Sequence, residues 1–550
     1  MTAEQSEPAG RPLGRVVSGS LSHGLRVRLD AAASVEDMAV GRLVVVEGGE
    51  ARFFGTIADV ALEAAPGLEA APVDLADPFV SQVLSGTTAY GTLQVVPSLR
   101  WGAEAQYAPG VVEGPQPAKT VPRHFSLVRE ASPQDVAMVF GQEDERHFSV
   151  GTPLDMEALV CLNMTELVLR SNGIFGKSGT GKTFLTRLLL AGILQKKAAA
   201  SLIFDMHNEY GWQGYGEGGY RVKGLKQLFP SQVAVFTLDE ESSRRRGVST
   251  DFVVRIGYQD IEPQDMETLK EVFNLTERSL DAIGEMAEAW GDAHWFGHFL
   301  SHTDKEVQGE LGERAQVPVG VLRALRLSLR QLARLPFLVE KPAGNSVNRI
   351  LEYLDRGMSV VLEFGSHESN LPAYVLVANI LTRRIHEHYV QRTEAASRPE
   401  DRPRPLVIVI EEAHKFLSPQ VSENTIFGTI AREMRKYNVT LLVVDQRPSG
   451  IDEEVMSQVG TKVVCLLDNE RDIESVLAGA PGRNELKLVL SRLDSRQQAL
   501  IFGHALPMPV VIRTRDYGPD FYRAMGFAEA AELKRGAEQA AKELWGGESS

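Results

Sequence analysis

The chain has 550 residues, of which 43% are hydrophobic and 24% are charged, the balance of an ordinary globular protein with a large core. The formal net charge of −15 argues against a surface that binds nucleic acid throughout, but not against a few basic side chains inside a ring. The two cysteines, Cys161 and Cys465, lie far apart and outside any CxxC pair. This argues against a disulfide framework and a structural zinc site, and Cys465 is expected in the core.

The N-terminal segment Met1–Pro12 is polar, and no apolar run approaches the ~18 residues of a membrane span. We therefore expect a cytoplasmic protein without a membrane segment of its own.

Residues 1–11 read as a disordered tail, and residues 12–125 as a small β-barrel. Short β segments with frequent turns and no long helix are typical of such a barrel. The expected strands are Gly14–Val17, Arg26–Leu29, Arg42–Val46, Arg52–Asp59 and Thr92–Val96, with a linker at Ala103–Thr120.

From about Leu167 the pattern changes to strand–loop–helix repeats, which predict an α/β fold with a parallel sheet covered on both faces. The first part of this core, residues 126–257, has strands at Glu166–Ile174, Ser201–Phe204 and Gln232–Leu238. Residues 258–345 read as a helical insertion, with helices at Glu262–Phe273, Glu277–Trp290 and Val317–Leu335. The core resumes over residues 346–517, and residues 518–550 read as a C-terminal helix. In the second part we expect strands at Met358–Phe364, Leu406–Ile410, Thr440–Asp445 and Thr461–Leu467 and helices at Ile350–Arg356, Pro372–Val390 and Ile426–Lys436.

A complete phosphate-binding loop follows the strand that ends near Ile174. It matches G-x-x-x-x-G-K-[ST] and precedes the helix Lys182–Leu194. Its glycines let backbone N–H groups surround a phosphate, Lys182 would reach the β- and γ-phosphates, and Thr183 would ligate Mg²⁺. The expected ATP-binding residues are Gly176, Lys177, Ser178, Gly179, Thr180, Gly181, Lys182 and Thr183.

Two carboxylates follow the apolar strand Leu406–Ile410, at the edge of a parallel sheet where nucleotides bind. We expect Glu411 to hold Mg²⁺ through water and Glu412 to polarise the attacking water. Glu411 is a mild departure, since P-loop motors more often have Asp there.

Further polar groups surround the strand Thr440–Asp445. Gln446 follows the strand and suits a sensor of the γ-phosphate. The helix before it ends in Arg432, Arg435 and Lys436, which either complement the helix dipole or supply a cation to a neighbouring subunit's phosphate. The segment Asp205–Tyr210 has too few ligands for zinc and suits water positioning or coupling to DNA.

Taken together, GKSGTGKT, FDMHNEYGW, IVIEEAHKF, REMRKYNV and VVDQRPSGIDEEVMSQVGTKVV resemble the HerA family of hexameric DNA translocases and helicases. These motifs span roughly residues 166–470. The β-rich N-terminal region resembles that family's small barrel, and Gln498–Arg515 resembles its closing strands. The fold that this resemblance implies is a RecA-like P-loop ATPase core with an N-terminal barrel and a helical insertion.

The resemblance also implies a homo-hexamer with ATP at the subunit interfaces, double-stranded DNA in a central channel, and a NurA-type nuclease as partner in end resection. Arg435 matches an arginine that would contact the γ-phosphate, and Arg170, on the strand before the P-loop, matches the family's other nucleotide-contacting arginine. In the segment Arg513–Tyr517, Arg515 would touch nucleotide across the interface. Asn438 stands where the family more often has Gly.

Two groups of arginines are candidates for sequence-independent phosphate contacts. One is Arg244–Arg246, and the other is the stripe of the helix Val317–Leu335, whose alternative reading is a solvated face over a packed leucine face. The stripe consists of Arg323, Arg326, Arg330 and Arg334.

The sequence thus predicts a Mg²⁺-dependent ATPase coupled to DNA translocation or unwinding in double-strand break repair. Three alternatives stay open: a conjugation or packaging pump, an ATPase ring that organises an effector in antiviral defence, and a nucleotide-binding scaffold without turnover.

Overall fold

The computed structural model describes residues 10–65, 80, 83–84, 88–102, 114–215, 221–270, 272–311, 317–367, 370–419, 426–480, 482–494 and 497–527. Most of the predicted tail, part of the predicted linker and most of the predicted C-terminal helix lie outside these residues. Of that helix, the structure describes α19 (Pro519–Ala524).

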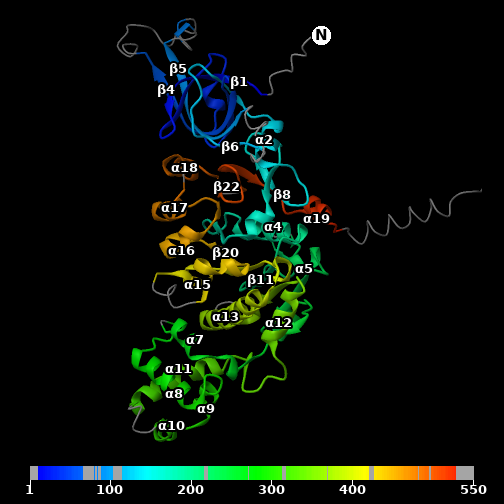
Figure 1. Cartoon of the computed structure of the whole chain (residues 1–550), viewed down its shortest axis with the longest axis vertical. Helices are drawn as coiled ribbons and strands as arrows, with labels where there is room; N and C mark the ends of the chain where they lie inside the picture. Colours follow the sequence, from blue (N-terminus) through cyan, green and yellow to red (C-terminus); the bar gives the residue numbers. More distant parts are fainter. Residues whose placement is uncertain are drawn as a thin grey trace, which may run out of the picture.

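The N-terminal strands form a closed barrel at one end of the molecule (Figure 1). Their order is β2-β1-β7-β3-β4-β5, and a β2–β5 pairing closes it, with β6 added beside β5. Alternating side chains such as Val27, Val95 and Val128 fill the interior. The strands are β1 (Pro12–Ser20), β2 (Gly24–Leu29), β3 (Leu43–Glu47), β4 (Ala51–Ala64), β5 (Ala89–Gly102), β6 (Gln116–Pro117) and β7 (Leu127–Glu130).

The core is a twelve-stranded sheet whose order is β15-β14-β18-β11-β19-β20-β10-β21-β22-β23-β8-β9. From β15 to β21 all pairings are parallel. The carboxyl ends of these strands therefore share one edge. The parallel strands are β10 (Asn172–Phe175), β11 (Ala200–Asp205), β14 (Val233–Thr237), β15 (Phe252–Val253), β18 (Ser359–Glu363), β19 (Leu406–Glu411), β20 (Val439–Asp445) and β21 (Thr461–Val464).

The other end of the sheet is antiparallel, so the expectation of an all-parallel sheet is wrong there. Strands from both ends of the core meet in it, because β23 (Val510–Thr514) pairs with β8 (His147–Pro153). The strand β22 (Gln498–Gly503) pairs with β23, and β9 (Val160–Asn163) pairs with β8.

Helices cover both faces of the sheet, as alternating strand residues require. In β11, Ile203 packs on the face covered by α4 (Lys182–Gln195), while Leu202 and Phe204 pack on the face that carries α13 (Leu371–Ala395). The other core helices are α2 (Pro133–Phe140), α5 (Leu225–Leu228), α6 (Glu240–Arg245), α12 (Ser346–Asp355), α14 (His414–Leu417), α15 (Ile426–Glu433), α16 (Glu453–Gln458), α17 (Glu470–Val476) and α18 (Arg483–Leu490).

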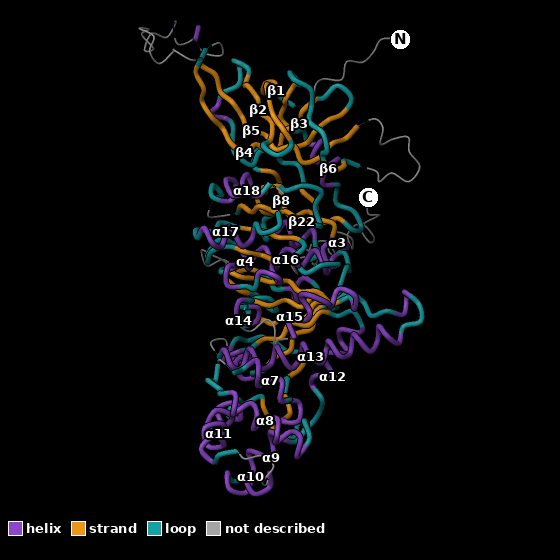
Figure 2. Tube along the Cα trace, turned by 60° about the vertical axis from the view of Figure 1, so that its left-hand side comes forward, coloured by secondary structure: helices purple, strands orange, loops and turns teal. Residues whose placement is uncertain are grey.

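The predicted insertion is helical and lies at the opposite end from the barrel (Figures 1 and 2). Its largest buried side chains include Trp295, Phe296 and Phe299. Its helices are α7 (Pro263–Thr268), shorter than expected, α8 (Glu277–Trp290), α9 (Trp295–Ser301), α10 (Asp304–Leu311) and α11 (Val319–Ala333). Short strands β16 (Ile256–Gly257) and β17 (Leu338–Val339) pair where the chain enters and leaves it.

The expected strand Glu166–Ile174 is wrong over its first half, which is helix α3 (Met164–Val168). The Asn163 side chain accepts from the Glu166 N–H at 3.1 Å and so caps this helix. The Asn172 amide then donates to the Leu167 and Arg170 carbonyls and turns the chain into β10. Similarly, the expected helix Ile426–Lys436 ends at Glu433 and continues as a 3-10 turn, Met434–Tyr437.

Over the residues that the structure describes, no helix combines the length and apolar character needed to cross a membrane.

Candidate nucleotide-binding site

The loop Gly176–Thr183 joins β10 to α4 at the carboxyl edge of the sheet. Gly179 and Gly181 adopt positive φ angles of 77° and 95°, which L side chains rarely tolerate. Gly181 begins α4 without a side-chain cap. The N–H groups of the first helical turn, where Thr183 lies, are therefore available to a phosphate.

The loop is held by contacts with Leu466 and Cys465 and by a hydrogen bond between its own lysines. The Lys177 N–H donates to the Leu466 carbonyl at 2.9 Å, and a Cβ at Gly176 would lie 2.7 Å from that of Cys465. Cys465 is thus a buried packing residue, as expected. Lys182 Nζ donates to the Lys177 carbonyl at 2.9 Å, and burial lowers the pKa of Lys182. The Lys182 side chain therefore lies over the P-loop, where we expect it to contact the phosphates.

Glu411 ends β19 and is buried. The Tyr210 hydroxyl donates to Glu411 Oε1 at 2.7 Å, whereas Oε2 has no hydrogen-bond partner among the described groups. Burial raises the pKa of Glu411 to about 8, and nearby Asp205 and Glu209 add to the rise. A buried carboxylate oxygen without a donor fits a water-bound Mg²⁺ next to Thr183.

Glu412 follows with a φ angle of 50°, which turns its side chain out of the strand. Gln446 Nε2 donates to Glu412 Oε1 at 3.2 Å, so the expected sensor contacts the expected base directly. His414 lies nearby, with Nδ1 2.9 Å from Asp445 Oδ2, and this hydrogen bond raises the pKa of His414. These groups come from two neighbouring strands, β19 and β20.

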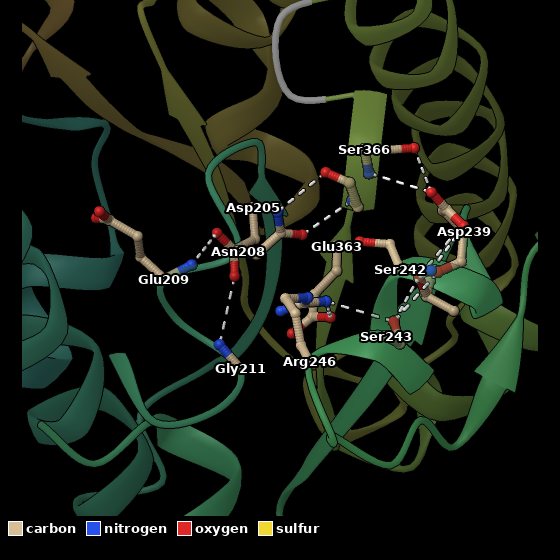
Figure 3. Close-up of polar contacts among 12 residues, drawn as sticks. Asp205, Asn208, Glu209, Gly211, Asp239, Ser242, Ser243, Arg246, Glu363 and Ser366 are labelled. Atoms are coloured by element: carbon tan, nitrogen blue, oxygen red, sulfur yellow. Dashed lines mark hydrogen bonds and ion pairs between the residues drawn. The ribbon is translucent and has the colours of Figure 1, made fainter. Parts of the chain in front are cut away.

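The segment after β11 holds Glu411 from the side. Asp205 is fully buried, and its carboxylate accepts from the N–H groups of Glu209 (2.8 Å), Tyr210 (2.8 Å) and Gly211 (3.3 Å) (Figure 3). Arg187 of α4 donates to the Glu209 carbonyl at 3.0 Å. The segment therefore links the P-loop helix to Glu411 through Tyr210.

The network continues outward along the same edge (Figure 3). The Asn208 amide exchanges two hydrogen bonds with the Gly365 backbone, at 2.9 and 3.2 Å. Next to it, Arg246 pairs with Glu363, which is fully buried. Burial raises the pKa of Glu363 to about 7, with Asp205 as a second cause.

Two of the arginines considered as DNA contacts are structural instead. Arg246 neutralises Glu363, and Arg326 is only 7% exposed. Arg326 Nε donates to Asp304 Oδ1 at 2.5 Å, and its guanidinium lies 4.2 Å from the centre of the Phe299 ring. A periodic stripe cannot reveal this, because the partner lies on another helix.

Arg170 and Arg435 lie away from the chain's own P-loop. Arg170 precedes β10 in a bend rather than on a strand, and Arg435 precedes β20 in the 3-10 turn. Since β10 and β20 are parallel neighbours, both arginines lie at the amino edge, opposite the P-loop. Arg435 is exposed, and the Arg170 Nε has no hydrogen-bond partner among the described residues.

Arg515 lies close to the chain's own P-loop. It lines a cavity of about 280 Å³ with Gly179, Gly181, Phe184 and Tyr517. Its guanidinium donates to Glu143 Oε1 at 3.0 Å and lies 5.2 Å from the centre of the Phe521 ring. The cavity therefore adjoins the glycines of the P-loop.

The sequence reasoning missed several residues that position the site. Tyr210 and Asp205 belong to a motif that was noted, but their tie to Glu411 depends on strands far apart in sequence. Arg187 lies on α4, which follows the P-loop, and Asp445 lies at the end of β20. These positions were the one available sign in the sequence that the two residues are near the site.

Comparison with known proteins agrees with these motifs. The family model described as "Helicase HerA, central domain" matches residues 148–385. The DNA double-strand break repair helicase HerA of Pyrococcus furiosus is 24% identical over 74% of this chain and 76% of its own length. That of Saccharolobus solfataricus is 25% identical over 70% of this chain and 71% of its own. Among solved structures, the bacterial conjugative coupling protein TrwBdeltaN70 is 10% identical, with 71% of this chain and 93% of that chain covered and a TM-score of 0.46, too distant to bear on function.

The P-loop, the paired glutamates and the Asp205–Tyr210 segment thus stand in one site, within a chain that follows its relatives over most of their length. The chain is a P-loop ATPase that resembles the HerA helicases over most of their length.

Proposed function

We propose that this protein is an ATP-driven translocase or helicase of double-stranded DNA that works as a hexameric ring. ATP would bind at the interfaces between subunits, and DNA would pass through the central channel. The names of the relatives, DNA double-strand break repair helicases, support a role in break repair. Resection of DNA ends with a NurA-type nuclease is the process that we infer.

One observation carries the proposal of a ring: the catalytic groups are divided between two edges of the sheet. Lys182, Glu411 and Glu412 lie at the carboxyl edge, while Arg170 and Arg435 precede their strands at the amino edge. A cation that stabilises charge on the transferred phosphoryl group must touch it. A second subunit that presents its amino edge to the P-loop supplies that cation.

Within each site the residues have separate tasks. The P-loop backbone and Lys182 bind the phosphates, and Thr183 and Glu411 hold Mg²⁺, which neutralises phosphate charge when bound. Glu412 accepts a proton from the attacking water, and Gln446, which contacts Glu412 directly, reports whether the γ-phosphate is present. Arg435 of the adjacent subunit stabilises the transition state.

The first test is steady-state ATP hydrolysis by the full chain with and without linear double-stranded DNA. We expect stimulation by DNA, and we expect Glu412→Gln to abolish turnover in both conditions. Hydrolysis that ignores DNA would contradict an autonomous translocase, and the assay would then be repeated with a NurA-type nuclease.

The second test asks whether the arginine acts between subunits. Arg435→Ala and Lys182→Ala are each expected to be inactive alone. In a mixed ring, an interface that joins the intact P-loop of the first variant to the intact Arg435 of the second is complete. Recovery of hydrolysis on mixing supports action in trans, whereas inactivity of every mixture of exchanging subunits would contradict it.

A further inference from the structure

A cluster of two histidines and a glutamate lies in the helical insertion, far from the P-loop. His298 is on α9, His302 follows the end of that helix, and Glu310 is on α10. Figure 1 draws these helices at the end of the molecule opposite the barrel. The cluster takes no part in the proposed function and contains no cysteine, so the argument from cysteine count does not apply to it.

The three side chains converge on one point. One nitrogen or oxygen from each lies within 4.8 Å of the others. His298 Nε2 is 2.7 Å from Glu310 Oε2, and His302 Nε2 is 3.9 Å from Glu310 Oε1. A tetrahedral Zn²⁺ with bonds of about 2.0–2.1 Å holds its ligand atoms roughly 3.3 Å apart. The two distances bracket that value, and the two stacked imidazole rings must turn relative to one another for both to coordinate one ion.

Hydrogen bonds also fix the orientation of one ligand. His302 Nδ1 lies 3.0 Å from the His298 carbonyl oxygen. A carbonyl oxygen can only accept, so Nδ1 donates this hydrogen bond and Nε2 is the nitrogen that faces Glu310. A backbone carbonyl behind the second ring nitrogen is the usual support of a metal-bound histidine.

Aromatic contacts involve both histidines of the cluster. The two imidazole rings stack with centroids 3.9 Å apart, and Trp290 packs on His298 at 4.3 Å. The three side chains are about one-third exposed, at 32%, 35% and 39%, so an ion and a water molecule can reach them.

We propose that His298, His302 and Glu310 bind one divalent transition-metal ion, with Zn²⁺ preferred and water as the fourth ligand. Imidazole and carboxylate ligands in this number suit Zn²⁺. The ion ties α9 to α10 and stabilises the insertion against unfolding, because it binds the folded arrangement alone.

The test uses the full chain without a histidine tag, stripped of metal and saturated with Mg²⁺ and ADP so that the nucleotide site is occupied. Isothermal titration calorimetry with ZnCl₂ is expected to give one binding site per chain. Thermal unfolding with ZnCl₂ is expected to give a higher melting temperature than without it. Co²⁺ in place of Zn²⁺ is expected to give the visible absorption of a tetrahedral complex. His302→Ala and Glu310→Gln should each lose the site, and Glu310→Gln keeps the shape of the side chain in case the alanine variant folds poorly.

His294→Ala is the matched control, because His294 is exposed and immediately precedes α9. It should bind Zn²⁺ as the wild type does. Absence of Zn²⁺ uptake by the wild type would overturn the proposal and leave a histidine–glutamate ion pair. Equal uptake by the wild type and both ligand variants would overturn it as well, since the ion would then lie elsewhere.

Discussion

The carboxyl edge of the sheet contains two buried glutamates that look alike in isolation. Glu411 ends β19 and Glu363 ends β18, and each has one carboxylate oxygen without a partner among the described groups. Burial raises the pKa of both, to about 8 and about 7. Yet Glu411 lies next to Glu412 and the P-loop, whereas Glu363 faces Arg246 of the same chain.

The difference shows that a raised carboxylate pKa reports burial of the side chain and does not by itself identify a functional residue. Glu363 pairs with Arg246 of the same chain, so it needs no bound ligand to balance its charge. Among the described residues, Glu411 has a tyrosine hydroxyl as its side-chain donor and no salt-bridge partner, and we propose that a bound Mg²⁺ completes its half of the edge. The predictions below test this distinction.

The largest effect is expected for Glu412→Gln in the nucleotide half. Loss of the general base should lower the rate of ATP hydrolysis by roughly 10²–10⁴-fold, while binding of a fluorescent ATP analogue persists. Turnover within tenfold of the wild type would mean that another group activates the water.

Glu363→Gln should change stability and its pH dependence. In the folded chain the pKa of Glu363 is about 7, above its ordinary value of 4.5, so folding takes up a proton and the free energy of unfolding falls as pH rises between these values. The shift corresponds to roughly 3 kcal/mol at most above pH 7. Because Arg246 is partly exposed, water can solvate it in the variant.

Melting temperatures of the wild type and Glu363→Gln at pH 5 and pH 8 measure this effect. The variant should gain stability relative to the wild type at pH 8 and little at pH 5. Parallel pH profiles would show that Glu363 is ionised in the folded chain throughout.

Tyr210→Phe should raise the Mg²⁺ concentration needed for hydrolysis by roughly tenfold, because it removes the hydrogen bond that orients Glu411. Tyr374→Phe is the matched control. That hydroxyl donates to the Glu411 backbone carbonyl at 3.1 Å and not to the carboxylate. An equal Mg²⁺ requirement in the two variants would argue that Tyr210 only packs.

The smallest effect is expected for Arg244→Ala. Arg244 forms an exposed pair with Glu240, and such pairs contribute little to stability. The melting temperature of Arg244→Ala should match that of the wild type. Arg246→Ala should have a lower melting temperature, because it leaves Glu363 buried without a countercharge. Equal melting temperatures would contradict the structural role of Arg246.

What could be predicted from the sequence was local. The P-loop, the strand before Glu411 and Glu412, and Gln446 after its strand are each written in a few consecutive residues. The contact between Gln446 and Glu412 was not predicted, because it depends on β19 and β20 being neighbours in the sheet.

What could not be predicted depends on partners distant in the chain. Arg246 reads as part of a basic run until Glu363 is placed opposite it. The first half of the expected strand before the P-loop became α3 because Asn163 caps it and Asn172 redirects the chain. The antiparallel part of the sheet was missed because its strands come from opposite ends of the core.

That last arrangement has a consequence for synthesis. All barrel strands lie within residues 12–130, so the barrel can close soon after it leaves the ribosome. In contrast, β8 and β9 are made early and pair with each other, but the other edge of β8 pairs with β23, near the end of the chain. At 5–20 residues per second they wait on the order of 20–70 seconds for that strand. During this interval β8 presents an unpaired edge. If the chain is released before β23 emerges, this edge of β8 can pair with strands of other chains.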